Sequence, residues 1–126
     1  MNIGIIESAV PVTLLGGGTV YDGDMVEALA LAPVCVAADS GARHALAADV
    51  DLAAVVGDFD SIGPDLERIP MSRQIQIDEQ DSTDFEKALT RITAPVVIAV
   101  GFTGGRIDHQ LAALHTLMVC ADRPVC

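Results

Sequence analysis

Carboxylates gather in one part of this 126-residue chain, between Gly57 and Asp84. The stretch opens with Gly-Asp-Phe-Asp-Ser at 57–61 and closes with Gln-Asp-Ser-Thr-Asp-Phe at 80–85. In proteins Mg²⁺ typically binds one or two carboxylates, keeps several waters and completes its shell with substrate phosphates. The residue types therefore predict that the two ends of the stretch meet in space and hold a divalent metal. That metal would in turn hold the phosphates of a nucleotide.

The first acidic pair, Asp58 and Asp60, flanks Phe59. In an extended segment both carboxylates would point to one side of the chain. Two carboxylates that close to each other are unfavourable unless a cation or a proton lies between them. The alternative is an ordinary turn, because Gly-Asp and Asp-Ser both favour turns.

The second acidic pair, Asp81 and Asp84, stands at the expected start of a helix. Asp81 could be the N-cap with Asp84 at position N3, since acids favour the first turn of a helix. Thr83 and Glu86 can also form part of a capping box. Capping and metal binding are compatible, because a cap fixes the carboxylate that it uses.

A third motif, Gly104-Gly105-Arg106, precedes another expected helix. Backbone N–H groups at a helix start can bind an anion, and Arg106 adds a charge that chelates phosphate oxygens. Asp108 and His109 fall in the first turn of that helix. The motif is neither a P-loop nor a G-x-G-x-x-G fingerprint.

These motifs must be positioned by alternating strands and helices. Four aliphatic runs predict buried strands, at Pro11–Leu15, Val34–Ala38, Leu52–Val56 and Pro95–Val100, and Gln74–Ile77 is a shorter strand candidate. Apolar spacing and helix-forming composition predict helices at Asp22–Leu31, Ala42–Ala48, Thr83–Thr93 and Arg106–Val119. This alternation predicts a Rossmann-like, three-layer α/β/α fold around a mostly parallel sheet of about five to six strands.

In such sheets a ligand sits outside the carboxyl ends of the strands. Four motifs follow strands directly, namely Gly16–Gly18, Asp39-Ser40-Gly41, Gly57–Asp60 and Gly101–Arg106. The segment Gln80–Asp84 can fold onto the same rim. We interpret His44 and His115 as structural residues.

Composition sets the class of protein. The chain is 51% hydrophobic but only 3% aromatic, which suits one α/β domain with an aliphatic core. Seven basic and eighteen acidic residues give a net charge of −11, which disfavours binding to nucleic acid or to an anionic membrane. Three cysteines without a C-x-x-C pair, and no basic, apolar leader, predict a soluble protein of the reducing cytoplasm.

Four segments together resemble the thiamin pyrophosphokinase (thiamin diphosphokinase) family. They are Ala-Asp-Ser-Gly-Ala at 38–42, Val-Gly-Asp-Phe-Asp-Ser-Ile at 56–62, Asp-Ser-Thr-Asp-Phe-Glu-Lys-Ala-Leu at 81–89 and Gly-Gly-Arg-Ile-Asp-His at 104–109. They stand in the family's order and at similar spacing, and the resemblance runs from about Leu14 to Leu114. The pairing of the second and third segments is the most specific part.

The resemblance implies transfer of the terminal pyrophosphoryl unit of ATP to the hydroxyl of thiamin, which leaves AMP. By matching position it implies three Mg²⁺ ligands, Asp58, Asp60 and Asp84. It places Asp39 beside the metal and phosphates, as a catalytic and ATP-binding residue. The nucleotide side would be completed by Gly41, Gly104, Gly105, Arg106, Asp108 and His109.

The resemblance also places Gln80 and Asp81 near the thiamin ring. The hydroxyl proton would pass to a carboxylate, and Asp81 and Asp108 remain equal alternatives for that role. Such a transfer needs charge neutralisation and alignment more than covalent help.

Two departures from the family pattern stand out. The family usually has Asp-Gly-Gly where this chain has Asp39-Ser40-Gly41, and we expect a different turn because serine tolerates positive φ poorly. The family also carries a C-terminal β-domain that helps form the thiamin site in a homodimer. We therefore expect residues 1–126 to be the single ATP- and Mg-binding catalytic domain, without that β-domain.

Three other classes share some of these features. A receiver-type phosphoacceptor domain needs paired acids after its first strand and a lysine after its last. Here the first strand ends in Gly16–Gly18, and Lys87 falls inside an expected helix. A nucleotide- and Mg-binding domain with little or no turnover, and a metal-dependent phosphohydrolase, stay open as alternatives.

Overall fold

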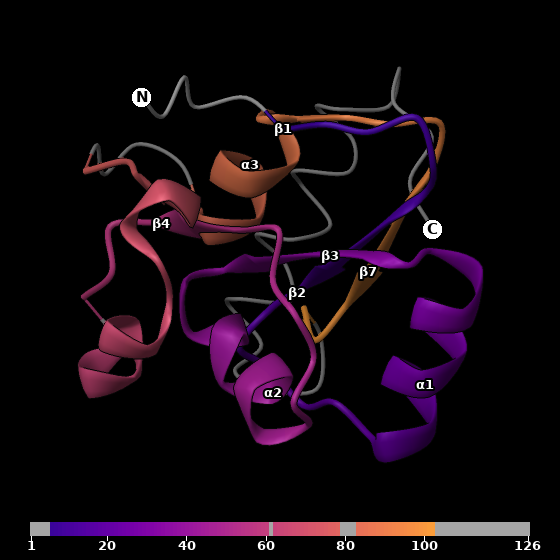
Figure 1. Ribbon diagram of the computed structural model, residues 1–126, viewed down its shortest axis with the longest axis horizontal. Helices are drawn as coiled ribbons and strands as arrows, with labels where there is room; N and C mark the ends of the chain where they lie inside the picture. The colour runs from indigo at the N-terminus through magenta and orange to yellow at the C-terminus, as the bar shows by residue number, and fades with distance from the viewer. Residues whose placement is uncertain (1–5, 61, 79–82, 103–126) are drawn as a thin grey trace.

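The computed structural model describes residues 6–60, 62–78 and 83–102 of the chain (Figure 1). Its centre is a five-stranded sheet in the order β5-β4-β3-β2-β7, with every neighbouring pair parallel. The strands are β2 (Val12–Leu15), β3 (Val34–Ala38), β4 (Ala54–Gly57), β5 (Gln74–Gln76) and β7 (Val97–Val100). The predicted parallel α/β sheet is therefore confirmed.

Side chains alternate across this sheet and fill two separate cores. On β2, Val12 and Leu14 belong to one core cluster, whereas Leu15 belongs to the other. On β3, Val36 and Cys35 divide in the same way. Because successive side chains of a strand point to opposite faces, a strand covered on both sides reads as a continuous aliphatic run.

Helices cover both faces and make the fold three layers thick (Figure 1). Helices α1 (Asp22–Leu31) and α2 (Ala42–Ala47) pack on one face, through Met25 and Leu29 of α1 and Ala42 and Ala45 of α2. Helix α3 (Asp84–Leu89) packs on the opposite face through Phe85, Ala88 and Leu89.

A buried hydroxyl ties α1 to the sheet. Thr13 is completely buried on β2, and its Oγ1 donates a hydrogen bond of 2.8 Å to the carbonyl of Ala32, just after α1 ends. A buried polar group without such a partner would cost free energy. The bond therefore fixes where the chain turns from α1 towards β3.

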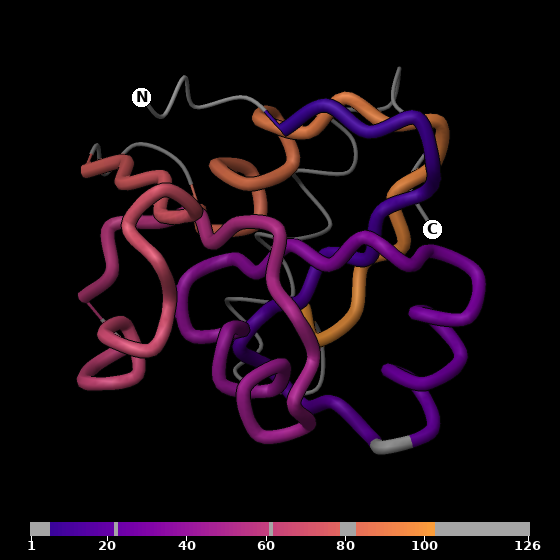
Figure 2. The backbone as a smooth tube through the Cα atoms, in the orientation of Figure 1, coloured from indigo at the N-terminus to yellow at the C-terminus, as the bar shows by residue number. Residues whose placement is uncertain are grey.

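The helix predicted over Thr83–Thr93 is shorter than expected. It ends at Leu89, and the next residues form strand β6 (Ile92–Thr93), which pairs in parallel with β1 (Ile6–Glu7). Figure 2 shows these two segments running side by side outside the main sheet. Ile92 is buried as the helical spacing predicted, but it reaches the core from a strand.

Two features were not predicted from the sequence. Strand β1 lies in a segment that carries no alternating pattern, and its pairing with β6 is a long-range contact. Two short 3₁₀-helices, Gly63–Arg68 and Met71–Arg73, connect β4 to β5. Within the described residues, no helix has the length and hydropathy of a membrane span.

Candidate functional site

Three carboxylates meet at the carboxyl edge of the sheet. Asp39 follows β3, Asp58 follows β4, and Asp84 is the first residue of α3. Each offers a carboxylate oxygen, and these oxygens all lie within 4.8 Å of one another. Residues 19 to 45 positions apart in the chain thus form one acidic cluster, which we call the Asp39–Asp58–Asp84 cluster.

Asp39 is the fixed member of this cluster. Its side chain is only 1% exposed, and its backbone has a φ of 46°, in the left-handed region. Asp and Asn adopt that region more readily than most non-glycine residues. Its Oδ2 accepts a hydrogen bond of 2.9 Å from the backbone N–H of Phe59, which joins the end of β3 to the turn after β4.

Gly57 makes room for that carboxylate. Its φ of 156° lies in a region that is open almost only to glycine. A Cβ built at this position would stand 2.8 Å from Asp39 Oδ2. The Gly-Asp dipeptide after β4 is therefore explained by the close approach of Asp39, in addition to turn formation.

The segment that carries Asp58 and Asp60 is not extended. Phe59 has a φ of 70°, and the backbone N–H of Asp60 donates to Asp58 Oδ1 at 3.0 Å. The prediction that both carboxylates point to one side of an extended segment is wrong, because the left-handed residue between them turns the chain. Asp58 is half-buried in the cluster, whereas Asp60 is exposed.

Asp84 is positioned by the start of α3. Thr83 is the N-cap, and its Oγ1 accepts a hydrogen bond of 3.2 Å from the backbone N–H of Glu86. This bond is one half of the capping box that the sequence suggested. The alternative, in which Asp81 is the N-cap, is wrong. Asp84 is exposed and supplies the third carboxylate of the cluster.

The Asp39-Ser40-Gly41 segment forms a short 3₁₀ turn between β3 and α2. Asp39 holds its positive φ, so Ser40 needs no strained backbone, and the expected penalty for serine at this position does not arise. Ser40 lies against the Gly16–Gly18 turn instead, since a Cβ at Gly17 would overlap Ser40 Oγ. Gly41 is required by close approach, because a Cβ there would overlap the carbonyl oxygen of Leu15.

The turn after β7 reaches the same region. Phe102 stacks on Phe85 of α3, with ring centroids 4.3 Å apart and an interplanar angle of 28°. A Cβ at Gly16 would stand 2.7 Å from the ring of Phe102. The ends of β2 and β7 and the start of α3 are therefore packed together beside the acidic cluster.

Several predicted site residues lie outside the described part of the chain. They are Gln80, Asp81, Gly104, Gly105, Arg106, Asp108 and His109, together with the helix predicted at Arg106–Val119. Their roles stay predictions. Of the predicted residues that the structure describes, Asp39, Asp58 and Asp84 lie together in the cluster. Gly41 packs against Leu15 in the turn that begins at Asp39, and Asp60 is exposed and outside the group of three.

Two residues of this region were not predicted as part of it. Lys87 is 4% exposed and lies three positions after Asp84 on α3. Its burial, unusual for lysine, has no local sequence signal. His44, which we interpreted as structural, hydrogen-bonds the Gly16–Gly18 turn through Nε2 and Gly18 O at 3.0 Å.

Cys35 does not contribute a nucleophile. It is 1% exposed on β3, and burial raises the pKa of its thiol to about 12. The neutral thiol is therefore the form present at physiological pH, and the reactive thiolate is suppressed. Cys35 is part of the hydrophobic core instead.

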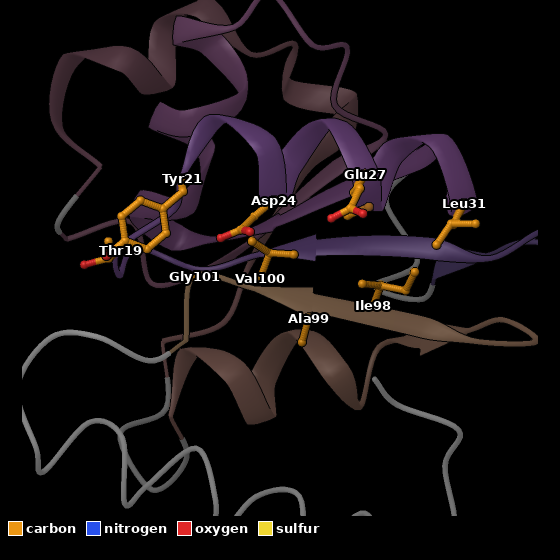
Figure 3. A pocket seen from close by; sticks show the side chains of 10 residues that line it. Thr19, Tyr21, Asp24, Glu27, Leu31, Ile98, Ala99, Val100 and Gly101 are labelled. Atoms are coloured by element: carbon orange, nitrogen blue, oxygen red, sulfur yellow. The ribbon is translucent and has the colours of Figure 1, made fainter.

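A different kind of surface lies between α1 and β7. An open pocket of about 470 Å³ lies there. Figure 3 shows Asp24, Glu27 and Leu31 of α1 on one side of it and Ile98 and Val100 of β7 on the other. Tyr21 and Thr19 line its end near Gly101. It lies on the face of the sheet opposite α3, and none of the three clustered carboxylates lines it.

The Asp39–Asp58–Asp84 cluster fits a hard divalent cation. Three carboxylates from separate elements repel each other at this spacing, and a cation removes that repulsion. All-oxygen ligands suit Mg²⁺, Mn²⁺ or Ca²⁺. The fold and the site together define an α/β protein with a candidate divalent-metal site at the carboxyl edge of a parallel sheet.

The family follows from comparison with known proteins. Residues 26–125 match the family described as thiamin pyrophosphokinase, catalytic domain. The chain belongs to the thiamin pyrophosphokinase family, as its motifs indicated.

Individual relatives agree with this assignment. Thiamine pyrophosphokinase 2 of rice is 31% identical over 54% of this chain and 30% of the rice protein. The crystal structure of thiamin pyrophosphokinase from Geobacillus thermodenitrificans is 29% identical, with a TM-score of 0.73, over 91% of this chain and 57% of that protein. A family member from Enterococcus faecalis is 33% identical, with a TM-score of 0.59, over 86% of this chain and 54% of that protein.

The chain spans 30% of the rice protein and little more than half of these two bacterial chains. The comparisons therefore concern the catalytic domain, and the activity of a whole protein is a proposal.

Proposed function

We propose that this chain is the ATP- and Mg²⁺-binding part of a thiamin pyrophosphokinase. The reaction joins the hydroxyl oxygen of thiamin to the β-phosphorus of ATP and breaks the bond from that phosphorus to the oxygen bridging it to the α-phosphate. The products are thiamin diphosphate and AMP. The observation that carries the proposal is the Asp39–Asp58–Asp84 cluster, in a chain whose family is thiamin pyrophosphokinase.

In this proposal Asp58 and Asp84 bind the metal. Asp39 is a third ligand, whereas the resemblance placed it only beside the metal. Support for Asp39 comes from its burial and from its oxygen within 4.8 Å of the other two. Asp60 stays a predicted ligand, directly or through a water. Bound Mg²⁺ would supply charge neutralisation for the phosphates.

The protein's own groups do the remaining work in the proposal. The backbone bond from Phe59 holds the Asp39 carboxylate in one orientation, and the Thr83 cap holds the start of α3. Gly41, Gly104, Gly105, Arg106, Asp108 and His109 would line the nucleotide. Gln80 and Asp81 would face thiamin, and Asp81 or Asp108 would accept the hydroxyl proton.

A second candidate is a nucleotide- and Mg-binding domain with little or no turnover. It is favoured by the length of the chain, which spans 57% of the G. thermodenitrificans enzyme. In that case this chain would bind Mg-ATP but require further residues for thiamin. A homodimer for the complete protein and the cytoplasm as its location also remain proposals. So does the absence of binding to nucleic acid or membrane, which the charge of −11 supports.

A product assay tests the proposal. ATP, thiamin and Mg²⁺ are incubated with this chain and with a longer protein that includes the remainder of the family's length, and nucleotides are separated by chromatography. We expect AMP and thiamin diphosphate in equal amounts from the longer protein. ADP or inorganic phosphate as the main product would contradict pyrophosphoryl transfer and favour a kinase or phosphohydrolase reaction. Mg-ATP binding by this chain without AMP formation would support the second candidate.

A further inference from the structure

The Gly16–Gly18 turn is held firmly although it contains three glycines. The backbone N–H of Gly16 donates to Val100 O at 2.7 Å, and that of Gly18 donates to Gly101 O at 2.6 Å. Gly17, between them, is exposed, and its N–H makes no hydrogen bond within residues 6–60, 62–78 and 83–102. Among the described residues, the turn therefore presents one backbone donor without a partner between two anchored residues.

His44 anchors this turn from the other side. It lies on α2, is half-buried, and its Nε2 is 3.0 Å from the carbonyl oxygen of Gly18. A carbonyl only accepts, so His44 Nε2 carries the proton and donates. Gly18 thus uses its N–H towards the end of β7 and its carbonyl towards α2.

The same helix begins directly after the Asp39 turn. Gly17 lies against Ser40, which is the residue after the buried Asp39. His44 lies further along the chain, on α2. The His44 bond therefore ties the Gly16–Gly18 turn to the helix that follows the Asp39 turn. Exposed backbone N–H groups in glycine turns bind phosphate oxygens.

We propose that His44 is a positioning residue, which holds the Gly16–Gly18 turn where the Gly17 N–H can bind a phosphate of the metal-bound nucleotide. The inference rests on the proposed function, because it requires that nucleotide. It assigns His44 no contact with the nucleotide and no proton transfer. His44 acts only by fixing the orientation of the Gly16–Gly18 turn.

The test compares His44→Ala with His44→Gln. Glutamine keeps an N–H donor on a side chain of similar reach, whereas alanine removes the donor. Calorimetry measures the affinity for Mg-ATP, and electron paramagnetic resonance measures the affinity for Mn²⁺ alone. Thermal unfolding monitors the fold of each variant.

For His44→Ala we expect Mg-ATP binding to weaken about threefold to tenfold, the effect of one ordinary hydrogen bond. Mn²⁺ binding without nucleotide should be unchanged, because His44 is not a ligand. His44→Gln should restore most of the Mg-ATP affinity. If His44→Ala does not fold, His44→Asn replaces it, since its shorter side chain cannot keep the same bond.

Equal Mg-ATP affinity in the wild-type chain and His44→Ala would overturn the inference and leave the proposed function standing. An equal loss of Mn²⁺ and Mg-ATP affinity would also overturn it, since His44 would then support the acidic cluster or the fold as a whole. A wild-type chain that binds Mn²⁺ but no Mg-ATP would contradict both the proposed function and this inference.

Discussion

The carboxyl edge around Asp39 and the pocket between α1 and β7 belong to one sheet but are built differently. At the carboxyl edge the backbone departs from ordinary geometry, with positive φ at Asp39, Gly57 and Phe59. The α1–β7 pocket is lined from a regular helix and a regular strand, together with the loop that leads into α1 and Gly101. Charge and the left-handed backbone of two non-glycine residues, Asp39 and Phe59, favour the carboxyl edge as the functional site.

This difference shows which kind of surface is specialised. Backbone strain persists only where surrounding structure holds it, and it is concentrated at functional sites. Asp39 is held by a hydrogen bond from Phe59 and by the space that Gly57 leaves. Around the α1–β7 pocket, Tyr21 and Leu31 are about 70% exposed, at 70% and 71%.

The largest effect should come from the acidic cluster itself. We expect Asp58→Asn and Asp84→Asn each to weaken Mg-dependent ATP binding at least about tenfold, since loss of even an outer partner of a metal ligand costs that much. Both substitutions keep the side-chain shape, so thermal unfolding should change little. Calorimetry with and without Mg²⁺ measures the effect.

The control for this experiment is Glu67→Gln, which removes one exposed negative charge away from the cluster. Its affinity should match that of the wild-type chain. Asp60→Asn sharpens the ligand set, and we expect a smaller loss than for Asp84→Asn because Asp60 is outside the group of three. Unchanged Mg-dependent ATP affinity in both Asp58→Asn and Asp84→Asn would contradict the assignment of these residues as metal ligands.

A second pair of variants compares the two regions through their glycines. Gly57→Ala should lower the free energy of unfolding by about 1–3 kcal/mol, because alanine disfavours this φ and its Cβ meets Asp39. Gly23→Ala on α1 should raise it by about 0.4–1 kcal/mol, since a Cβ there meets nothing within 4 Å. Urea denaturation measures both, and a stabilising Gly57→Ala would show that the strain at this edge is absent.

The smallest effect should follow changes at the pocket. Leu31→Ala removes a side chain that is 71% exposed, so we expect a stability change within about 0.5 kcal/mol and an unaltered affinity for Mg-ATP. Urea denaturation measures the stability change, and calorimetry measures the affinity for Mg-ATP. A loss of Mg-ATP affinity above about threefold would mean that the α1–β7 pocket takes part in nucleotide binding, and the contrast between the regions would fail.

The amino-acid sequence alone determined the architecture, because the signals for it are local. Helix α1 and strand β3 begin and end where their apolar patterns predict, and the alternation of strands and helices indicated the parallel sheet. The order of motifs also identified the family, which the match over residues 26–125 bears out. The meeting of Asp58 with Asp84 was expected, since both follow from elements that end or begin at one rim.

The tertiary structure decided the details that depend on distant neighbours. The burial of Asp39, the space at Gly57 and the bond from His44 to Gly18 join residues that are 18 to 26 positions apart. The turn at Phe59 and the early end of α3 at Leu89 are likewise set by partners outside their own segments. Local propensity cannot specify such contacts, because their free energy comes from packing and hydrogen bonds that exist only once the sheet is assembled.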